Sequence, residues 1–367
     1  MDKKKVLIAS VLKPVNEPRM YKKLGLSLAE FPNLDVHIAG FSSNNKQSDN
    51  KISFHPIFNF KRISLGRMQS NYKFLALLNR IKPEILIVNT FELLNSAIKY
   101  KKNNDCFLIY DIRENHSLNV SRLGIYPFPL NHLLATYIRN IELKASRQID
   151  HFFLAEKCYL DELPFIGPKH TVLENKYQGE KIRRNIFNPD NIRFAFTGTA
   201  HHSTGIFKAI NFVDSINKLG QKAQLNLCIH ATKEDVYSRL NKISYPWLSG
   251  EIKSNPVDNY EIIEVYKRSD VLLAPYHVNE QNRNKFPTKL YDALANGIPM
   301  IISENNYWKK NCNPKAPLIH FDFNSSPDTS VIEAIKLKIH SDFKDESALW
   351  NSEKIKLNFL NTVLDSS

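Results

Sequence analysis

Short apolar segments alternate along the chain with longer segments in which apolar residues recur every three or four positions. In the first half, the apolar segments predict buried strands at 5–12, 35–41, 84–89, 107–111 and 151–154. The segments with helical spacing predict helices at 19–31, 72–80, 92–100 and 133–146. Strands that alternate with helices are typical of a parallel sheet covered by helices on both faces.

The same alternation occurs again in the second half. Strands are predicted at 193–197, 224–229, 271–275 and 300–303. Helices are predicted at 206–218, 259–268 and 288–296, and an amphipathic helix at 346–364. Two such series predict two Rossmann-like domains, whose ligands bind beyond the carboxyl ends of the strands.

The polar segment 176–191, which contains Gly179 and Pro189, predicts the junction between the two domains. We therefore expect domains at 1–180 and 181–345, followed by a C-terminal helix within 346–367. A chain of 367 residues is long enough for two cores of ordinary size.

The first twelve residues, the lengths of the apolar segments and the spacing of the cysteines lead us to expect a cytoplasmic protein. Residues 1–12 begin with lysines and an apolar run, but the run is too short for a signal peptide and predicts a buried strand. No segment reaches the roughly 18 apolar residues of a membrane span. The four cysteines form no CxxC pair, so neither a zinc site nor a redox motif is predicted.

The net charge of +13 is concentrated in the first half of the chain. Residues 1–184 hold 29 Lys and Arg against 17 Asp and Glu, whereas residues 185–367 hold 21 against 20. No nucleic-acid motif accompanies this excess, so we expect no nucleic-acid partner. An anionic membrane surface and an anionic acceptor both fit it. The apolar, Pro-rich segment 121–130 suits contact with such a surface, or packing on the protein's own core.

The segment 284–303 contains a candidate anion site. Pro287 suits the first position of a helix, and the following Thr288 and Lys289 would offer backbone N–H groups to an anion. Lys289 adds a positive charge. Asp292, one turn later, is placed to accept hydrogen bonds from a ribose. The alternative is an ordinary capped helix in which Asp292 stabilises the helix dipole.

The sequence PTKLYDALANGIP at 287–299 resembles the signature of the retaining glycosyltransferases of the glycogen-synthase-like GT-B group. In that signature two carboxylates are separated by seven residues. The second acid is present here as Asp292, and Asn284 stands in place of the first. The resemblance implies an α/β protein with the GT-B architecture, in which two Rossmann-like domains face each other across a cleft and a C-terminal helix follows.

The resemblance also implies where the donor binds. FTGTAHHSTGIFKAI at 196–210 is similar to the family's strand, glycine, loop and helix, although Thr199 and Thr204 stand where the family carries an Arg and a Lys. A solvated loop is the alternative interpretation of this segment. The expected donor-binding residues are Gly198, Thr199, His201, His202, Ser203, Asn284, Phe286, Pro287, Thr288, Lys289 and Asp292.

In the first domain, NEPR at 16–19 and YDIREN at 110–115 resemble the family's cleft-facing loops. This resemblance makes Asp111, Arg113 and Glu114 the expected catalytic residues. Arg113 replaces the usual His; an arginine cannot shuttle protons, but it can bind phosphate. An exposed Arg113–Glu114 ion pair is the alternative. Arg19 and His116 are the expected acceptor-side residues.

The expected reaction is transfer of a sugar from a nucleotide-diphosphate donor to the hydroxyl of a glycan or lipid-linked acceptor. The resemblance implies retention of configuration and a place in bacterial-type surface polysaccharide or glycolipid synthesis. We expect no metal and no cofactor beyond the donor, and a cytoplasmic chain peripheral to the inner face of the membrane. Two alternatives remain open: a non-catalytic GT-B protein that binds a partner or glycan, and a nucleotide-sugar epimerase.

Overall fold

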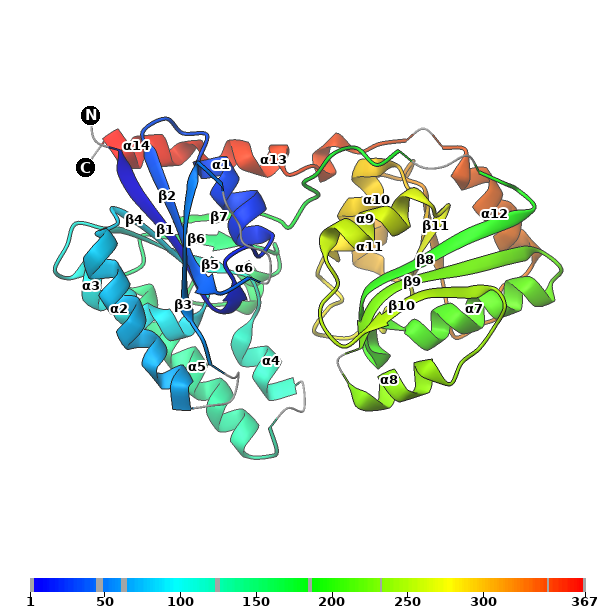
Figure 1. Ribbon diagram of the computed structural model, residues 1–367, viewed down its shortest axis with the longest axis horizontal. Coiled ribbons are helices and arrows are strands. Elements are labelled where there is room, and N and C mark those ends of the chain that lie inside the picture. Colours follow the sequence, from blue (N-terminus) through cyan, green and yellow to red (C-terminus); the bar gives the residue numbers. More distant parts are fainter. Residues whose placement is uncertain are drawn as a thin grey trace. The chain divides into compact units, whose positions relative to one another are not determined.

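The strands of the chain form two separate parallel sheets, one in each of two units (Figure 1). The computed structural model describes residues 3–43, 49–60, 65–122, 126–183, 187–231, 233–341 and 343–365. Unit 1 comprises Met1–Gln178 and Trp350–Ser367, and unit 2 comprises Gly179–Leu349. The chain thus divides at 178/179, where the sequence suggested 180/181. Of the predicted junction, residues 184–186 lie outside the described residues.

Unit 1 contains a seven-stranded sheet in the order β3-β2-β1-β4-β5-β6-β7, and all the pairings between these strands are parallel. The order 3-2-1-4-5 is that of a Rossmann domain. Its strands are β1 (Lys4–Pro14), β2 (Leu34–Phe41), β3 (Ile52–Phe58), β4 (Ile85–Val88), β5 (Phe107–Ile112), β6 (His151–Leu154) and β7 (His170–Val172).

Helices cover both faces of this sheet because its central strands are apolar on both sides. In β1, Leu7 and Ala9 pack into one core, and Val6 and Ile8 pack into the other. The helical segments of the first 178 residues are η1 (Arg19–Gly25), α1 (Leu26–Leu28), η2 (Leu65–Gln69), α2 (Ser70–Ile81), η3 (Phe91–Leu93), α3 (Leu94–Lys101), α4 (His116–Arg122), α5 (Leu130–Ser146) and α6 (Tyr159–Glu162).

The C-terminal segment packs on unit 1 and completes its second core. Trp350 is buried, and its indole N–H donates to the Ser27 hydroxyl at 2.9 Å. The segment is not the single helix that the periodicity predicts, because Leu349 has an extended backbone with φ −82° and ψ 145°. Instead, η5 (Glu346–Ala348) ends unit 2, and α13 (Asn351–Lys354), η6 (Ile355–Asn358) and α14 (Phe359–Asp365) follow in unit 1.

Unit 2 contains a six-stranded parallel sheet in the order β10-β9-β8-β11-β12-β13, which repeats the Rossmann order. Its strands are β8 (Asn191–Ala200), β9 (Lys222–Ala231), β10 (Leu248–Lys253), β11 (Val271–Ala274), β12 (Met300–Ser303) and β13 (Leu318–Phe321). Its helical segments are η4 (His202–Thr204), α7 (Ile206–Lys218), α8 (Glu234–Asn241), α9 (Asn259–Lys267), α10 (Thr288–Asn296), α11 (Asn306–Asn311) and α12 (Thr329–Ile339).

Phe194 and Phe196 of β8 lie in the core of unit 2, together with apolar residues of α7 and α12. The described helices include none that is both long enough and apolar enough to cross a membrane.

Candidate functional site

In unit 2, the chain reverses its direction of progress across the sheet between β8 and β11, which are adjacent. The carboxyl end of such a strand pair is where open α/β sheets bind their ligands. The segment 198–205 comprises the last residues of β8 and the loop that follows it, and the segment that leads to α10 follows β11. These are the two segments in which the sequence predicts donor-binding residues.

Two glycines and internal hydrogen bonds determine the backbone conformation of the segment 198–205. Gly198 and Gly205 have φ values of 82° and 78°, which favour glycine. A Cβ on Gly205 would lie 1.9 Å from the carbonyl oxygen of Pro275, so only glycine allows this close packing. The Thr204 hydroxyl accepts a hydrogen bond from the His201 N–H at 2.9 Å. Thr204 thus stabilises the loop and supplies none of the positive charge of the family's lysine.

The two histidines of this loop have local partners. His201 Nδ1 lies 3.0 Å from the Ser203 hydroxyl, and burial, with Lys233 and His202 nearby, lowers the pKa of His201. His202 is exposed and lies 3.0 Å from the carboxylate of Asp235. The Ser203 carbonyl accepts from the His277 N–H at 2.9 Å, which joins the loop to the segment after β11. Donor binding by these residues stays a prediction.

Lys289 crosses from α10 to the end of β8. Its ammonium nitrogen lies 4.6 Å from the centre of the Phe196 ring and 5.8 Å from that of Tyr276. A Cβ on Gly198 would lie 3.6 Å from Lys289 Cε, so the lysine side chain runs directly over this glycine. Within the described residues the ammonium makes these ring contacts and no hydrogen bond. Burial lowers the pKa of Lys289 to about 8, with Asp292 opposing the shift.

The start of α10 has the features of an anion site. Pro287 is the N-cap residue, one position earlier than predicted, and no side chain caps this end of the helix. Asp292 lies one turn into α10, and its carboxylate accepts from the Tyr266 hydroxyl at 3.4 Å. Gly297 ends the helix in the left-handed conformation, with φ 62°. Lys289 and Asp292 therefore lie on the first turns of a helix whose N-terminus is open.

The remaining predicted donor residues have different surroundings. Phe286 is buried and stacks on Tyr291, with 5.4 Å between the ring centres, so it anchors the segment before α10. Asn284, Thr288 and Thr199 are exposed. They are accessible to a ligand, and their contact with the donor stays a prediction.

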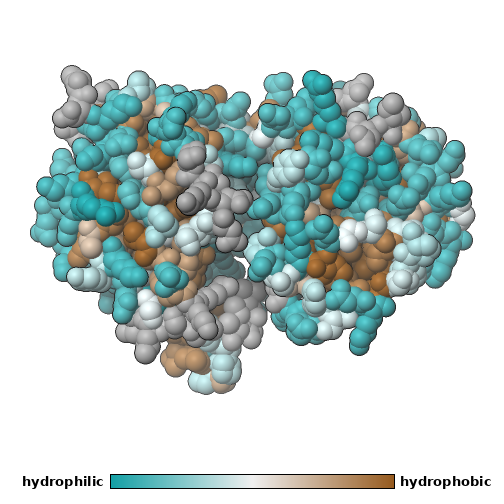
Figure 2. Space-filling model, viewed as in Figure 1, coloured by the Kyte–Doolittle hydropathy of each residue, from teal (hydrophilic) through white to brown (hydrophobic). Residues whose placement is uncertain are grey.

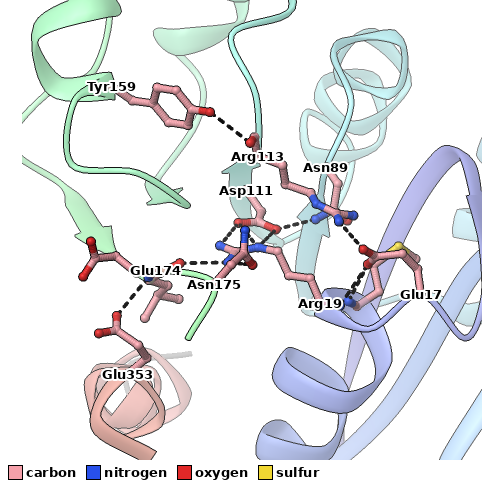
Figure 3. Close-up of polar contacts among 11 residues, drawn as sticks. Glu17, Arg19, Asn89, Asp111, Arg113, Tyr159, Glu174, Asn175 and Glu353 are labelled. Carbon is pink, nitrogen blue, oxygen red and sulfur yellow. Dashed lines mark hydrogen bonds and ion pairs between the residues drawn. The ribbon is translucent and has the colours of Figure 1, made fainter. Parts of the chain in front are cut away.

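In unit 1, Arg19 and Asp111 form a buried ion pair at the carboxyl end of β5 (Figure 3). Arg19 Nε donates to both carboxylate oxygens, at 3.1 and 2.9 Å, and Nη2 donates to one of them at 2.5 Å. Arg19 Nη1 also donates to the Leu173 carbonyl at 2.8 Å and to Asn175 at 2.9 Å. Burial opposes the charge of Arg19, but Asp111 raises the pKa of its guanidinium.

Both side chains of this pair are essentially inaccessible to solvent. The second oxygen of Asp111 also accepts from the Asn89 amide. These contacts favour a positioning role for Arg19 and Asp111, since they join η1 to β5 and to the segment after β7. Direct contact of either residue with a substrate stays a prediction.

Arg113 pairs with Glu17 and not with its neighbour Glu114 (Figure 3). Burial opposes the charge of Glu17, but Arg113 and the backbone N–H of Met20 lower its pKa. The Tyr159 hydroxyl donates to the Arg113 carbonyl at 3.0 Å and fixes the backbone there. Within the described residues, Arg113 Nη1 is buried without a hydrogen-bond partner. Arg113 is thus held by one half of its guanidinium and has donor capacity left for a ligand.

Glu114 and His116 lie just beyond the same strand end. The Glu114 carboxylate accepts from the Asn119 amide at 2.8 Å. Burial opposes its charge, but His116, Lys13 and this hydrogen bond lower its pKa. The described residues offer no hydrogen-bond partner to the buried atoms His116 Nε2 and Asn89 Oδ1. With Arg113, they give this strand end unsatisfied donors and an acceptor, which suits a ligand rich in hydroxyl groups.

Solved structures match the chain over its whole length. Sucrose-phosphate synthase from Thermosynechococcus elongatus matches with a TM-score of 0.66 and 12% identity, over 99% of this chain and 100% of that one. The catalytic domain of starch synthase IV from Arabidopsis thaliana, bound to ADP and acarbose, matches at 0.64 and 11%, over 100% of both chains. Anabaena HepE in complex with UDP and glucose matches at 0.60 and 11%, over 99% and 100%.

The two Rossmann-ordered sheets match the fold of these structures. The chain has the GT-B fold. This agrees with the resemblance of residues 287–299 to the glycogen-synthase-like GT-B group. No protein-family model matches the sequence, and no curated protein matches it. At 11–12% identity the likeness establishes the GT-B fold, and the activity has to be argued from the site.

Several residues of the two candidate sites, one in each unit, were missed by the sequence interpretation. Tyr276 is the second residue after β11, so its position near a strand end could have indicated it. Phe196 and Tyr266 carry no local pattern that separates them from core residues. Glu17 and Asn89 acquire their roles through partners far away in the sequence.

Among the described residues, no group of three or more His, Cys, Asp or Glu side chains is arranged to hold a metal ion.

Proposed function

We propose that this chain transfers a sugar from a nucleotide-diphosphate donor to a hydroxyl acceptor. The observation that carries the proposal is the ammonium of Lys289, which lies beside Gly198 at the open N-terminus of α10 in a GT-B fold. Gly198 allows a ligand to approach the backbone, and the helix start and the ammonium both favour an anion there. The diphosphate of the donor is such an anion.

In the reaction, the bond between the anomeric carbon and the diphosphate breaks, a bond to the acceptor oxygen forms, and the proton of the acceptor hydroxyl passes to the departing diphosphate. The departing diphosphate carries negative charge, which Lys289 and the first N–H groups of α10 are placed to stabilise. Asp292, one turn further on, accepts hydrogen bonds from the ribose hydroxyls. The solved structures of starch synthase IV with ADP and of HepE with UDP and glucose support a nucleotide donor for this fold.

Unit 1 binds the acceptor at the carboxyl end of β5. Arg113 Nη1 and His116 Nε2 supply hydrogen-bonding capacity to it, and Glu114 supplies a carboxylate with a lowered pKa. Arg19 and Asp111 hold this strand end in place. The acceptor is a glycan or a lipid-linked hydroxyl, as in bacterial-type surface polysaccharide or glycolipid synthesis. Transfer retains the anomeric configuration and needs no metal, and the chain works in the cytoplasm at an anionic membrane surface.

The test is incubation of the full chain with a panel of nucleoside-diphosphate sugars. Release of the free nucleoside diphosphate, slowed by Lys289→Met, is the expected result. A non-catalytic GT-B protein would bind a nucleotide or glycan without turnover. A nucleotide-sugar epimerase would change the sugar's configuration, which NMR of the recovered sugar detects. Either result would replace the proposal.

A further inference from the structure

The first turns of α5 and the residues just before it carry a row of exposed apolar side chains. Phe128 is 81% exposed, Leu133 65% and Tyr137 60%, and Leu130 is exposed as well. Leu130, Leu133 and Tyr137 are spaced by three and four residues and so share one helix face. We call these four residues the α5 apolar face. Figure 2 shows hydrophobic side chains at this end of unit 1.

The sequence assigned either membrane contact or core packing to the segment 121–130. Phe128 is exposed, which excludes core packing for that side chain, whereas residues 123–125 lie outside the described residues. In Figure 1, the ends of α4 and α5 that meet at this segment extend beyond the sheet of unit 1. The α5 apolar face is therefore presented at a projecting end of its unit.

The exposed charged side chains between residues 115 and 149 are all cationic. Between residues 115 and 149 the sequence holds Arg122, Arg139, Lys144 and Arg147, and Glu142 is the one acid. Glu142 is buried, where it accepts from the Tyr110 hydroxyl at 2.9 Å and pairs with Arg139. Arg122, Lys144 and Arg147 are exposed. The described surface of α4 and α5 is thus apolar at its tip and cationic along its length.

The apolar tip and the cations along its length fit an anionic lipid surface better than a second copy of the chain. If two copies of the chain paired through this face, the same cations would meet across the symmetry axis and repel each other. Four side chains also supply less than the roughly 800 Å² per partner of a stable interface. An anionic lipid surface accommodates both features, because apolar side chains enter its interfacial layer and cations attract its headgroups.

We propose that the α5 apolar face docks this chain on an anionic lipid bilayer. Phe128, Leu130, Leu133 and Tyr137 enter the interfacial layer, and Lys144 and Arg147 contact the phosphate headgroups. Docking by this face requires no donor or acceptor. Its consequence for the acceptor does rest on the proposed function: α4 has seven residues, or about 10 Å, so Glu114 and His116 lie near the bilayer surface, and the acceptor is lipid-linked.

The test is co-sedimentation of the full chain with vesicles of phosphatidylcholine alone or mixed equally with phosphatidylglycerol. We expect binding to the mixed vesicles at low salt, little binding to phosphatidylcholine, and release at high salt. Phe128→Ser with Leu133→Ser lowers the partition coefficient about tenfold or more. Lys144→Glu with Arg147→Glu lowers it at least about fivefold for each position.

Matched controls come from unit 2. Tyr260 and Leu337 are 70% and 77% exposed there, so Tyr260→Ser with Leu337→Ser controls for the loss of exposed apolar surface. Lys222→Glu with Lys242→Glu controls for the change of net charge, since both lysines are exposed. Circular dichroism checks that each variant is folded.

Equal loss of binding in the control and α5 variants would overturn the proposal, as would equal binding to neutral and anionic vesicles. A chain that is dimeric in light scattering, and becomes monomeric in Phe128→Ser with Leu133→Ser, would identify the face as a self-association surface instead. Failure of donor turnover, with vesicle binding intact, would overturn the proposed function and leave the docking proposal standing.

Discussion

The ammonium of Lys289 lies 4.6 Å from the centre of the Phe196 ring, beside Gly198 near the carboxyl end of β8. In the family that residues 287–299 resemble, an arginine and a lysine of the loop after this strand bind the diphosphate. Here Thr199 and Thr204 occupy those places, and Thr204 is used to hold the loop together. Lys289 brings a positive charge to the same strand end, but it comes from α10 and not from the loop after β8.

This arrangement has an energetic cost in the free protein. Burial lowers the pKa of Lys289 to about 8, and the faces of Phe196 and Tyr276 replace only part of the lost hydration. A bound diphosphate would supply the missing counter-charge. The charge of Lys289 therefore favours diphosphate binding but destabilises the folded free protein.

The first prediction is that Lys289→Met stabilises the free chain at pH 7 by about 1–2 kcal/mol, because it removes a partly desolvated charge. The sign follows from linkage. A lysine with a lowered pKa in the folded state binds fewer protons than in the unfolded state, so wild-type stability rises with pH above about 8. Urea unfolding at several pH values measures this. Lys222→Met, at an exposed site, is the control, and a clear destabilisation by Lys289→Met would refute the prediction.

The second prediction concerns pH and affinity. Nucleoside-diphosphate binding needs the charged form of Lys289, so affinity falls about fivefold between pH 8 and pH 9. The phosphate groups are already ionised in this range. Lys289→Arg keeps its charge and should lose this dependence. Titrations of both proteins across this range decide it, and parallel pH profiles would show that Lys289 is not the titrating group.

The third prediction is that Asp292→Ala weakens nucleotide binding by about 1–3 kcal/mol, the typical effect of losing hydrogen bonds to a charged acceptor. Asp292→Asn keeps the size and some acceptor capacity, and should lose less. Calorimetry measures both. If Asp292→Ala binds every nucleotide as tightly as the wild type, Asp292 does not contact the ribose.

The fourth prediction separates two kinds of residue in unit 1. Arg19→Ala leaves the buried Asp111 carboxylate without its partner and should cost about 3–5 kcal/mol of stability. Arg113→Ala and Glu114→Ala should lower turnover about tenfold to a hundredfold while stability falls much less.

Arg113→Lys is the matched variant, since it keeps a charge beside Glu17 but loses the guanidinium's second donor edge. It should remain as stable as the wild type and still lose turnover. Melting curves and initial rates are compared for each variant. Full activity in Arg113→Ala and Glu114→Ala would remove both residues from the site.

The fifth prediction is that turnover persists in a metal chelator. It rests on the sequence, which contains no DxD-like pair, and on Lys289 and the α10 N-terminus as sources of positive charge for the diphosphate. Initial rates with and without EDTA test it. Complete loss of activity, restored by magnesium or manganese, would contradict it.

The inner strands of both sheets could be predicted from the sequence, whereas the edge strands could not. Every predicted strand is present, and the four strands that were not predicted, β3, β7, β10 and β13, are the outer strands of the two sheets. Inner strands such as β4 are buried along their whole length and give continuous apolar runs. Edge strands lack this pattern: β10 is half-buried to exposed, and β3 contains Pro56, which an edge tolerates.

The site was predictable where its chemistry depends on local sequence. Lys289 and Asp292 are placed by their distance from the start of α10, which the sequence shows. The surroundings of Arg113 and Asp111 depend instead on Glu17 and Arg19, which lie 96 and 92 residues away. No local pattern distinguishes a buried pair from a catalytic one, so the burial of Asp111 had to come from the structure.

Calorimetric titration of the full chain with nucleoside diphosphates tests the central claim most directly, with Lys289→Met as the variant. We expect at least one nucleoside diphosphate to bind to the wild type. We also expect Lys289→Met to weaken this binding by about tenfold or more, although the variant is the more stable protein. Absence of binding to every nucleoside diphosphate, or equal affinity in the wild type and Lys289→Met, would contradict it.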